Sequence, residues 1–171
     1  MIRALFLVTC YACLRAGEAV ISNDVSHTLH LHQVQLVKVG ATNSFHIHFR
    51  SYKHSNHATP LIVIPPSGDN LTCPVIALST YLRHRGSSPG PIFLSLTHAP
   101  ITRDYFTAIL KQAVVLAGYQ DTSFNTHSFR IGRATQMAMD NVPDHVIKAT
   151  GRWKTNAFLK YIRIQAIYSP S

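Results

Sequence analysis

The sequence predicts an α+β fold that is mostly helical and contains one small antiparallel sheet of three strands. Two observations predict it. Residues 30–64 contain three short segments rich in β-branched and aromatic residues, separated by turn-forming residues. The rest of the chain carries longer apolar segments that begin at capping residues or prolines and stop near glycines. With 171 residues and 46% hydrophobic content, the chain suits one domain with a buried core.

The N-terminal segment is expected to form one mostly buried helix over residues 2–20, which carries Arg15 and Glu18 near its end. The apolar run from Ala4 to Leu14 also resembles a short signal peptide. Cysteine and tyrosine residues interrupt that run, and it is too short to span a membrane. We therefore expect a helix of the folded domain, with secretion of a small basic protein as an alternative.

The sheet is expected from residues 30–39, 44–53 and 61–64, with a hairpin turn at residues 40–43. In the second strand Phe45, Ile47 and Phe49 alternate with polar residues, which predicts one buried face. Two prolines end the third strand. The three strands together predict an antiparallel meander.

Five helices are expected after the sheet. Pro74 stands at a first-turn position, where a proline is favourable. Thr102, Thr126 and Thr155 each stand where a side-chain oxygen can cap a helix. The expected ranges are 74–85, 103–117, 127–140 and 143–150, followed by a last short helix that includes Tyr161.

The charge of the chain indicates a polyanionic partner. Sixteen Lys and Arg residues against 7 Asp and Glu give a formal net charge of +9. Such an excess favours binding to nucleic acid, ahead of binding to a membrane surface.

The three cysteines do not form a disulfide framework, which favours a reducing compartment. Cys10 and Cys13 form a C-x-x-C pair that could act in redox chemistry or supply half of a zinc site. No second cysteine pair completes such a site, and His27, His30 and His32 have the spacing of a strand. We expect both thiols inside an apolar helix, and no metal or cofactor.

Four residues suit attack on a phosphodiester. Arg15 and Arg130 can each grip two phosphate oxygens, His127 can move a proton, and the phenol of Tyr161 can act as a nucleophile. His127 and Arg130 are three positions apart and share one face of a helix. Each residue alone is more often a surface pair, a cap or a core side chain; their combination favours catalysis.

Further residues can support this chemistry. Glu18, one turn from Arg15, can orient its guanidinium, and Trp153 can pack against the site and donate its indole N–H. Lys53 stands beside the turn between the second and third strands, where it can protonate the leaving oxygen. Lys38 is the alternative for this role.

The ordered motif H-x-x-R at 127–130, G-x-W at 151–153 and Tyr161 resembles the catalytic domain of tyrosine recombinases, the phage-integrase-like enzymes. Segments 127–132, 151–154 and 161–163 resemble the eukaryotic mobile-element, crypton-like branch. The resemblance implies the fold of DNA breaking-rejoining enzymes and cleavage through a 3′-phosphotyrosyl intermediate, without a cofactor. The implied catalytic residues are Arg15, Lys53, His127, Arg130, Trp153 and Tyr161, with Glu18 in support.

The same resemblance implies duplex DNA as the partner and self-association into a tetrameric synapse. It implies a nuclear location in a eukaryote and a cytoplasmic, nucleoid location otherwise. Residues 1–171 are expected to form the catalytic domain alone, without the N-terminal core-binding domain or the C-terminal tail of the family. The alternative is a non-catalytic DNA-binding remnant of a mobile element.

Overall fold

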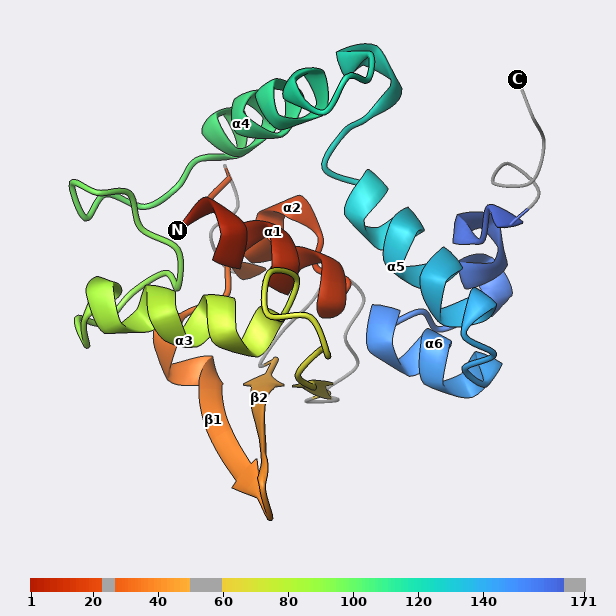
Figure 1. The fold of residues 1–171 in the computed structure, drawn as a ribbon, viewed down its shortest axis with the longest axis horizontal. Helices are drawn as coiled ribbons and strands as arrows, with labels where there is room; N and C mark the ends of the chain where they lie inside the picture. Colours follow the sequence, from red (N-terminus) through yellow and green to blue (C-terminus); the bar gives the residue numbers. More distant parts are fainter. Residues whose placement is uncertain (23–26, 50–59, 165–171) are drawn as a thin grey trace.

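The structure, a computed structural model, describes residues 1–22, 27–49 and 60–164 of the chain. It confirms the α+β prediction, with helices arranged around one antiparallel sheet (Figure 1). Its elements are α1 (Ile2–Tyr11), α2 (Ala16–Ala19), η2 (Leu31–Gln33), β1 (Val34–Val39), β2 (Thr42–His48), β3 (Leu61–Ile64), α3 (Pro74–Arg85), α4 (Arg103–Leu116), η3 (Asp121–Ser123), α5 (Ser128–Met139), α6 (Asp144–Gly151) and η4 (Asn156–Tyr161). None of the helices in these ranges is long and apolar enough to cross a membrane.

The N-terminal segment is broken, so the prediction of one helix over residues 2–20 is wrong. Helix α1 ends at Tyr11, and Cys13 takes the left-handed conformation with φ 47°. Arg15 then caps the short helix α2, and the Glu18 carboxylate accepts a hydrogen bond of 2.8 Å from the Arg15 backbone N–H. The turn aims the Arg15 and Glu18 side chains differently from a continuous helix.

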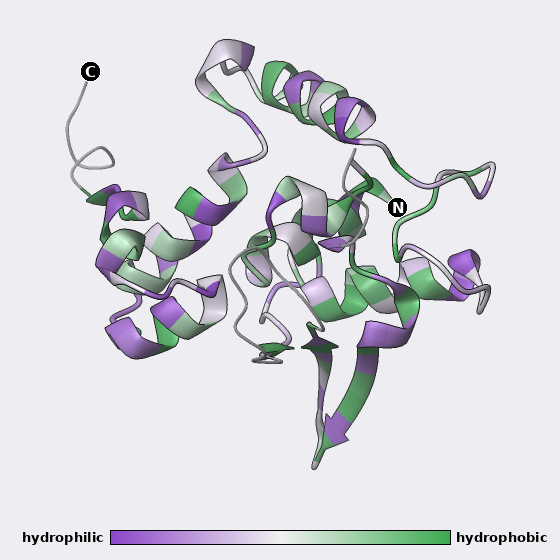
Figure 2. Ribbon diagram, turned by 180° about the vertical axis from the view of Figure 1, so that it is seen from behind, coloured by the Kyte–Doolittle hydropathy of each residue, from purple (hydrophilic) through white to green (hydrophobic). Residues whose placement is uncertain are grey.

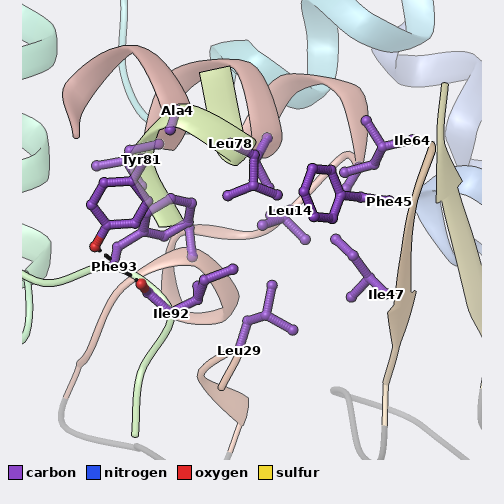
Figure 3. Close-up of a cluster of buried hydrophobic side chains, with 14 of the residues drawn as sticks. Ala4, Leu14, Leu29, Phe45, Ile47, Ile64, Leu78, Tyr81, Ile92 and Phe93 are labelled. Atoms are coloured by element: carbon purple, nitrogen blue, oxygen red, sulfur yellow. Dashed lines mark hydrogen bonds between the residues drawn. The ribbon is translucent and has the colours of Figure 1, made fainter. Parts of the chain in front are cut away.

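The sheet has the order β1-β2-β3, and its register pairs Phe45 with Ile64 and Ile47 with Ile62. These four side chains share one face and are buried against the core, as the alternation predicts. Figure 3 shows Phe45, Ile47 and Ile64 with the core residues Leu14 and Leu78.

The limits of the first two strands differ from the prediction. The first strand begins at Val34, because residues 31–33 form a 3₁₀ turn. The second begins at Thr42, because Gly40 and Ala41 alone make the hairpin turn, with Gly40 at φ 60°. That strand ends at His48, so Phe49 falls outside it, contrary to the prediction, and the rest of the predicted strand, residues 50–53, lies outside the described residues.

Local signals fix most of the helices. Helix α3 has the predicted range, and Thr102 and Thr155 cap their helices by accepting 3.2 Å hydrogen bonds from backbone N–H groups. The element after Thr155 is a 3₁₀ helix. The predicted cap at Thr126 is wrong: His127 is the capping position, and its N–H donates to Asn125 Oδ1 at 2.8 Å.

Two hydrophobic clusters meet beside α5. The larger lies between α1, α3 and the sheet, and the smaller lies between α5, α6 and η4. Helices α4, α5 and α6 each carry both hydrophobic and hydrophilic residues, as expected for amphipathic helices (Figure 2). The Phe129 ring packs against Phe6 at 5.2 Å and Phe106 at 5.7 Å between ring centroids. This contact holds the start of α5 against α1, and the next residue along the chain is Arg130.

Candidate active site

The side chain of Tyr161 lies against three other predicted site residues. Its ring centroid is 4.9 Å from that of His127 and 4.9 Å from that of Trp153. The Arg130 guanidinium carbon lies 5.7 Å from the Tyr161 ring and 4.6 Å from the Trp153 ring. The structure therefore brings together residues from α5, the end of α6 and η4.

Arg15 joins this group across a hollow of about 430 Å³. Arg15, His127 and Arg130 line the hollow together with Arg103, which is the first residue of α4. Among the described residues that line it, none is acidic. A hollow bordered by three guanidinium groups and an imidazole suits an anion.

Arg15 is held on one side and open on the other. Its Nη1 group forms a 2.8 Å ion pair with Glu18 Oε1, and 31% of its side chain is exposed. This contact between Arg15 and Glu18 is the one that the sequence predicts. An arginine held in this way keeps donor groups for a phosphate, because the guanidinium has five N–H groups in all.

Arg130 is almost completely buried, with an exposed fraction of 1%. Its Nη1 donates to the Cys13 carbonyl and its Nη2 to the Gly151 carbonyl, the latter at 2.9 Å. Its Nε has no hydrogen-bond partner among the described residues. Burial, with the nearby charges of Arg15 and Arg152, lowers its pKa. The positive charge of Arg130 is therefore costly at this position, and a bound anion would lower that cost.

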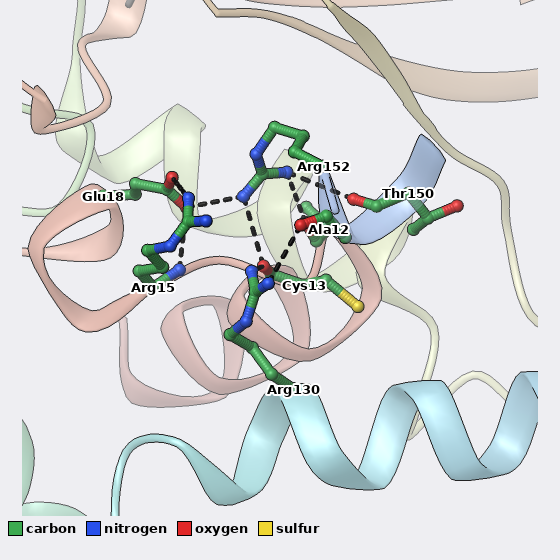
Figure 4. A network of polar contacts seen from close by, with 8 residues as sticks. Ala12, Cys13, Arg15, Glu18, Arg130, Thr150 and Arg152 are labelled. Carbon is green, nitrogen blue, oxygen red and sulfur yellow. Dashed lines mark hydrogen bonds and ion pairs between the residues drawn. The ribbon is translucent and has the colours of Figure 1, made fainter. Parts of the chain in front are cut away.

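Arg152 is a member of this cluster that the sequence analysis missed. Its Nη2 lies 2.5 Å from Glu18 Oε2 and 3.2 Å from the Cys13 carbonyl oxygen, and its Nη1 donates to the Ala12 carbonyl at 3.1 Å. Figure 4 shows Arg152, Glu18 and Arg15 joined in one network, with Arg130 on the same Cys13 carbonyl. The only signal in the sequence is that Arg152 stands inside the G-x-W motif.

Glu18 is ionised in this network. Burial alone would raise its pKa, but the Arg152 charge and the hydrogen bonds and charge of Arg15 outweigh burial, and the pKa is lowered. The carboxylate is thus shared between an arginine that faces the hollow and one that is buried.

His127 is able to accept a proton near neutral pH. Burial, together with the charges of Arg130 and Arg15, lowers its pKa below the usual value, so the imidazole is neutral. A neutral imidazole beside the Tyr161 ring can take the phenolic proton.

Arg103, the other residue that the sequence analysis missed, is brought to the hollow by a backbone contact. Its N–H donates to the Ile21 carbonyl at 3.1 Å, and Thr102 forms a bridge with Ile21. The start of α4 therefore lies beside α2. Only its place directly after the Thr102 cap marks Arg103 in the sequence.

Lys53 and Lys38 are the two candidates for the general acid. Lys53 lies outside the described residues. Lys38 is exposed on β1, one residue before the strand ends at the Gly40–Ala41 turn. It is not among the described residues that line the hollow.

The cysteines do not have the character of a reactive pair. Burial raises the pKa of Cys13 to about 11 and also raises that of Cys10, so both thiols stay protonated at neutral pH. Cys13 lies in the turn after α1, outside the helix where it was expected. In the described ranges, no group of three or more His, Cys, Asp or Glu residues is placed to hold a metal ion.

The Trp153 ring lies on the end of α6. A Cβ atom on Gly151 would stand 1.7 Å from Trp153 Cζ3, so only glycine leaves room for this ring. The indole Nε1 is buried without a partner among the described residues.

Replacing Gly151 with alanine is expected to displace the Trp153 ring and lower the free energy of unfolding by about 1–3 kcal/mol. The measurement is urea unfolding followed by intrinsic fluorescence, because Trp153 is the single tryptophan. Gly132→Ala is the matched control, since nothing lies within 4 Å of the added Cβ. That control should keep the native emission and lose no stability. Equal behaviour of the two variants would contradict the close contact.

Comparison with known proteins agrees with the family resemblance of the sequence. Residues 2–163 match the model of the phage integrase family. The fold is similar to the XerH site-specific recombinase bound to palindromic difH substrate in a post-cleavage complex, with a TM-score of 0.69 and 13% identity over 95% of this chain and 41% of that one. The pre-cleavage complex of XerH has a TM-score of 0.68 and 13% identity over 97% and 43% of the two chains.

A third similar structure is the Tn1549 transposon integrase in complex with transposon right end DNA. Its TM-score is 0.55, with 13% identity over 99% of this chain and 54% of that one. The chain thus spans about two-fifths to about half of these structures. No curated protein matches the chain in sequence. Since the family match covers nearly the whole chain, this protein belongs to the phage integrase family.

Proposed function

We propose that this chain binds duplex DNA and cleaves one strand with Tyr161 as the nucleophile. The observation that carries the proposal is the position of the Tyr161 ring, in contact distance of His127 and Trp153 and near the Arg130 guanidinium. A phenol needs a proton acceptor and nearby positive charge to attack at neutral pH, and both are supplied here.

The proposed step exchanges one phosphodiester link for another. The Tyr161 phenolic oxygen bonds to phosphorus, the bond from phosphorus to the 5′-oxygen breaks, and a 3′-phosphotyrosyl link remains. The phenolic proton passes to His127, and the leaving 5′-oxygen takes a proton from a general acid, for which Lys53 is our candidate. Attack by a 5′-hydroxyl reverses the step and rejoins a strand.

The positive groups around the hollow would bind the scissile phosphate. Arg15 offers its exposed donors, and Arg130 has an Nε that is without a partner in the described part of the chain. Trp153 has a similar indole N–H. Preorganised donors of this kind stabilise the charge that develops on phosphate oxygens in the transition state.

We further propose that residues 1–171 correspond to the catalytic domain of a recombinase and that copies associate on DNA during strand exchange. Segments 127–132, 151–154 and 161–163 support a relation to the eukaryotic mobile-element branch. The protein would then act wherever the DNA lies, in the nucleus of a eukaryote or the nucleoid of a prokaryote.

Covalent trapping tests the proposed reaction. The substrate is a pool of duplexes with randomised sequence, each carrying a nick beside the scissile position, so that the short 5′-hydroxyl fragment is lost after cleavage. We expect a protein–DNA adduct on a denaturing gel. DNA binding without any adduct would contradict cleavage and support the non-catalytic alternative.

Arg103 gives a separate test of DNA binding. Arg103→Ala is expected to weaken binding to duplex DNA and to lower the slope of log K against log salt by about one, because one phosphate contact is lost. Arg83→Ala removes the same charge from a different hollow, between α3 and the sheet. Fluorescence anisotropy over a salt series should separate the two. The same slope for both variants would place DNA elsewhere on the protein.

A further inference from the structure

Arg152 ends helix α6 in a conformation that non-glycine residues rarely adopt. Its φ is 55° and its ψ is 42°. Four non-glycine residues in the described ranges have a positive φ, and two of them, Cys13 and Arg152, belong to one network. Such conformations are held by surrounding contacts, and they concentrate at functional sites.

The Arg152 guanidinium connects both phosphate-binding arginines. Through its 2.5 Å ion pair it holds Glu18, and Glu18 holds Arg15 at 2.8 Å. Through its 3.2 Å hydrogen bond it holds the Cys13 carbonyl, which also accepts from Arg130. Arg15 and Arg130 are thus linked through one buried side chain (Figure 4).

Arg152 itself does not face the hollow. Only 1% of its side chain is exposed, and it is not one of the described residues that line the hollow. Its guanidinium carbon lies over the Phe49 ring at 4.3 Å, and it donates to the Thr150 carbonyl at 3.2 Å on the side of α6. A phosphate in the hollow therefore has no direct access to this charge.

We propose that Arg152 is a positioning residue, which sets Arg15 and Arg130 at the separation that one phosphate requires by gripping Glu18 and the Cys13 carbonyl. This role rests on the proposed function of the site. It assigns the buried arginine to alignment of the site, whereas Arg15 and Arg130 contact the DNA.

The balance of charges supports this role. Without Arg152, the buried Glu18 would keep Arg15 as its one positive partner among the described residues, while burial would still favour its protonated form. The pKa of Glu18, lowered in the wild type, would rise. Activity that needs ionised Glu18 is lost as the pH falls through this pKa, so the loss would begin at a higher pH in the variant.

The test uses Arg152→Met, Glu18→Gln and the double variant, with single-turnover adduct formation on the nicked duplex measured against pH. We expect Arg152→Met to lower the rate by roughly 10²-fold, as displaced groups do, with DNA affinity nearly unchanged. Its acid limb should move to a higher pH. In the Glu18→Gln background the same change should cost much less, because the two residues act as a unit.

Three results would overturn the proposal: an unchanged pH profile, the same rate loss with and without Glu18, or a loss of DNA affinity equal to the loss of rate. Should Arg152→Met fail to fold, Arg152→Lys replaces it. Lysine keeps the positive charge but cannot donate to Glu18 and the Cys13 carbonyl as the planar guanidinium does. Arg152→Lys should therefore keep the acid side of the pH–rate profile closer to that of the wild type than the cleavage rate. A wild-type acid limb in Arg152→Lys without rate loss would overturn the alignment role.

Titration of the Glu18 carboxyl carbon by NMR in the free protein separates this inference from the proposed function. The Glu18 pKa should lie below the usual glutamate range in the wild type and should rise in Arg152→Met. This shift without any wild-type adduct would refute cleavage but keep the Arg152–Glu18 coupling. A wild-type adduct without the shift would refute the inference alone.

Discussion

Replacing Tyr161 with phenylalanine is expected to abolish the covalent protein–DNA adduct while leaving DNA affinity and the fold unchanged. Phenylalanine keeps the ring that contacts His127 and Trp153, and it removes only the oxygen that we propose as the nucleophile. The measurement is adduct formation on the nicked duplex pool, with thermal unfolding as the check on folding.

Tyr11→Phe is the matched control for this variant. The Tyr11 ring also lies against an arginine, with the Arg133 guanidinium carbon 4.5 Å from its centroid, but Tyr11 is on α1. This control should form the adduct at the wild-type rate. An adduct that persists in Tyr161→Phe, or disappears in Tyr11→Phe, would assign the nucleophile to another residue.

Replacing Arg130 with methionine is expected to lower the cleavage rate by roughly 10²–10³-fold, because one preorganised donor group to the phosphate is lost. Most of the DNA affinity should remain, since under the proposed function other cations would still contact the DNA backbone. The variant also leaves the Gly151 carbonyl without its arginine donor, which costs on the order of 1–3 kcal/mol, whereas the Cys13 carbonyl keeps its hydrogen bond from Arg152. Single-turnover cleavage, anisotropy and urea unfolding measure the three effects.

Arg133→Met serves as the control, because it removes the same charge three positions further along the same helix. It should cleave DNA at a rate close to that of the wild type. Arg130→Lys should remain slow, since a lysine cannot bridge two carbonyl oxygens as the planar guanidinium does. Equal losses of binding and cleavage in Arg130→Met would contradict a specific role at the scissile phosphate.

Elements with strong local signals were predictable from the sequence. The third strand, Leu61–Ile64, is bounded by prolines, and α3 begins at a first-turn proline; both have the predicted ranges. The break after α1 was not predictable. Its turn is held by hydrogen bonds to the Cys13 carbonyl from Arg130 and Arg152, which are 117 and 139 positions away. Periodicity within residues 2–20 carries no trace of those partners.

The site residues also divide into those that the sequence predicted and those that it did not. The family pattern and the residue chemistry predicted the group of Arg15, His127, Arg130 and Tyr161, and the structure brings these residues together. The pairing of Glu18 with Arg152 was missed, because arginine is normally exposed and nothing local to residue 152 indicates burial. That pairing depends on how α6 ends against the α1–α2 turn, which only the folded chain defines.

The most direct test of the central claim is mass-spectrometric identification of the residue that is attached to DNA after trapping on a nicked duplex. The position of the Tyr161 ring against His127 and near Arg130 predicts attachment of a 3′-phosphate to the Tyr161 oxygen. Attachment to any other residue, or to the 5′ end of the cleaved strand, would contradict it.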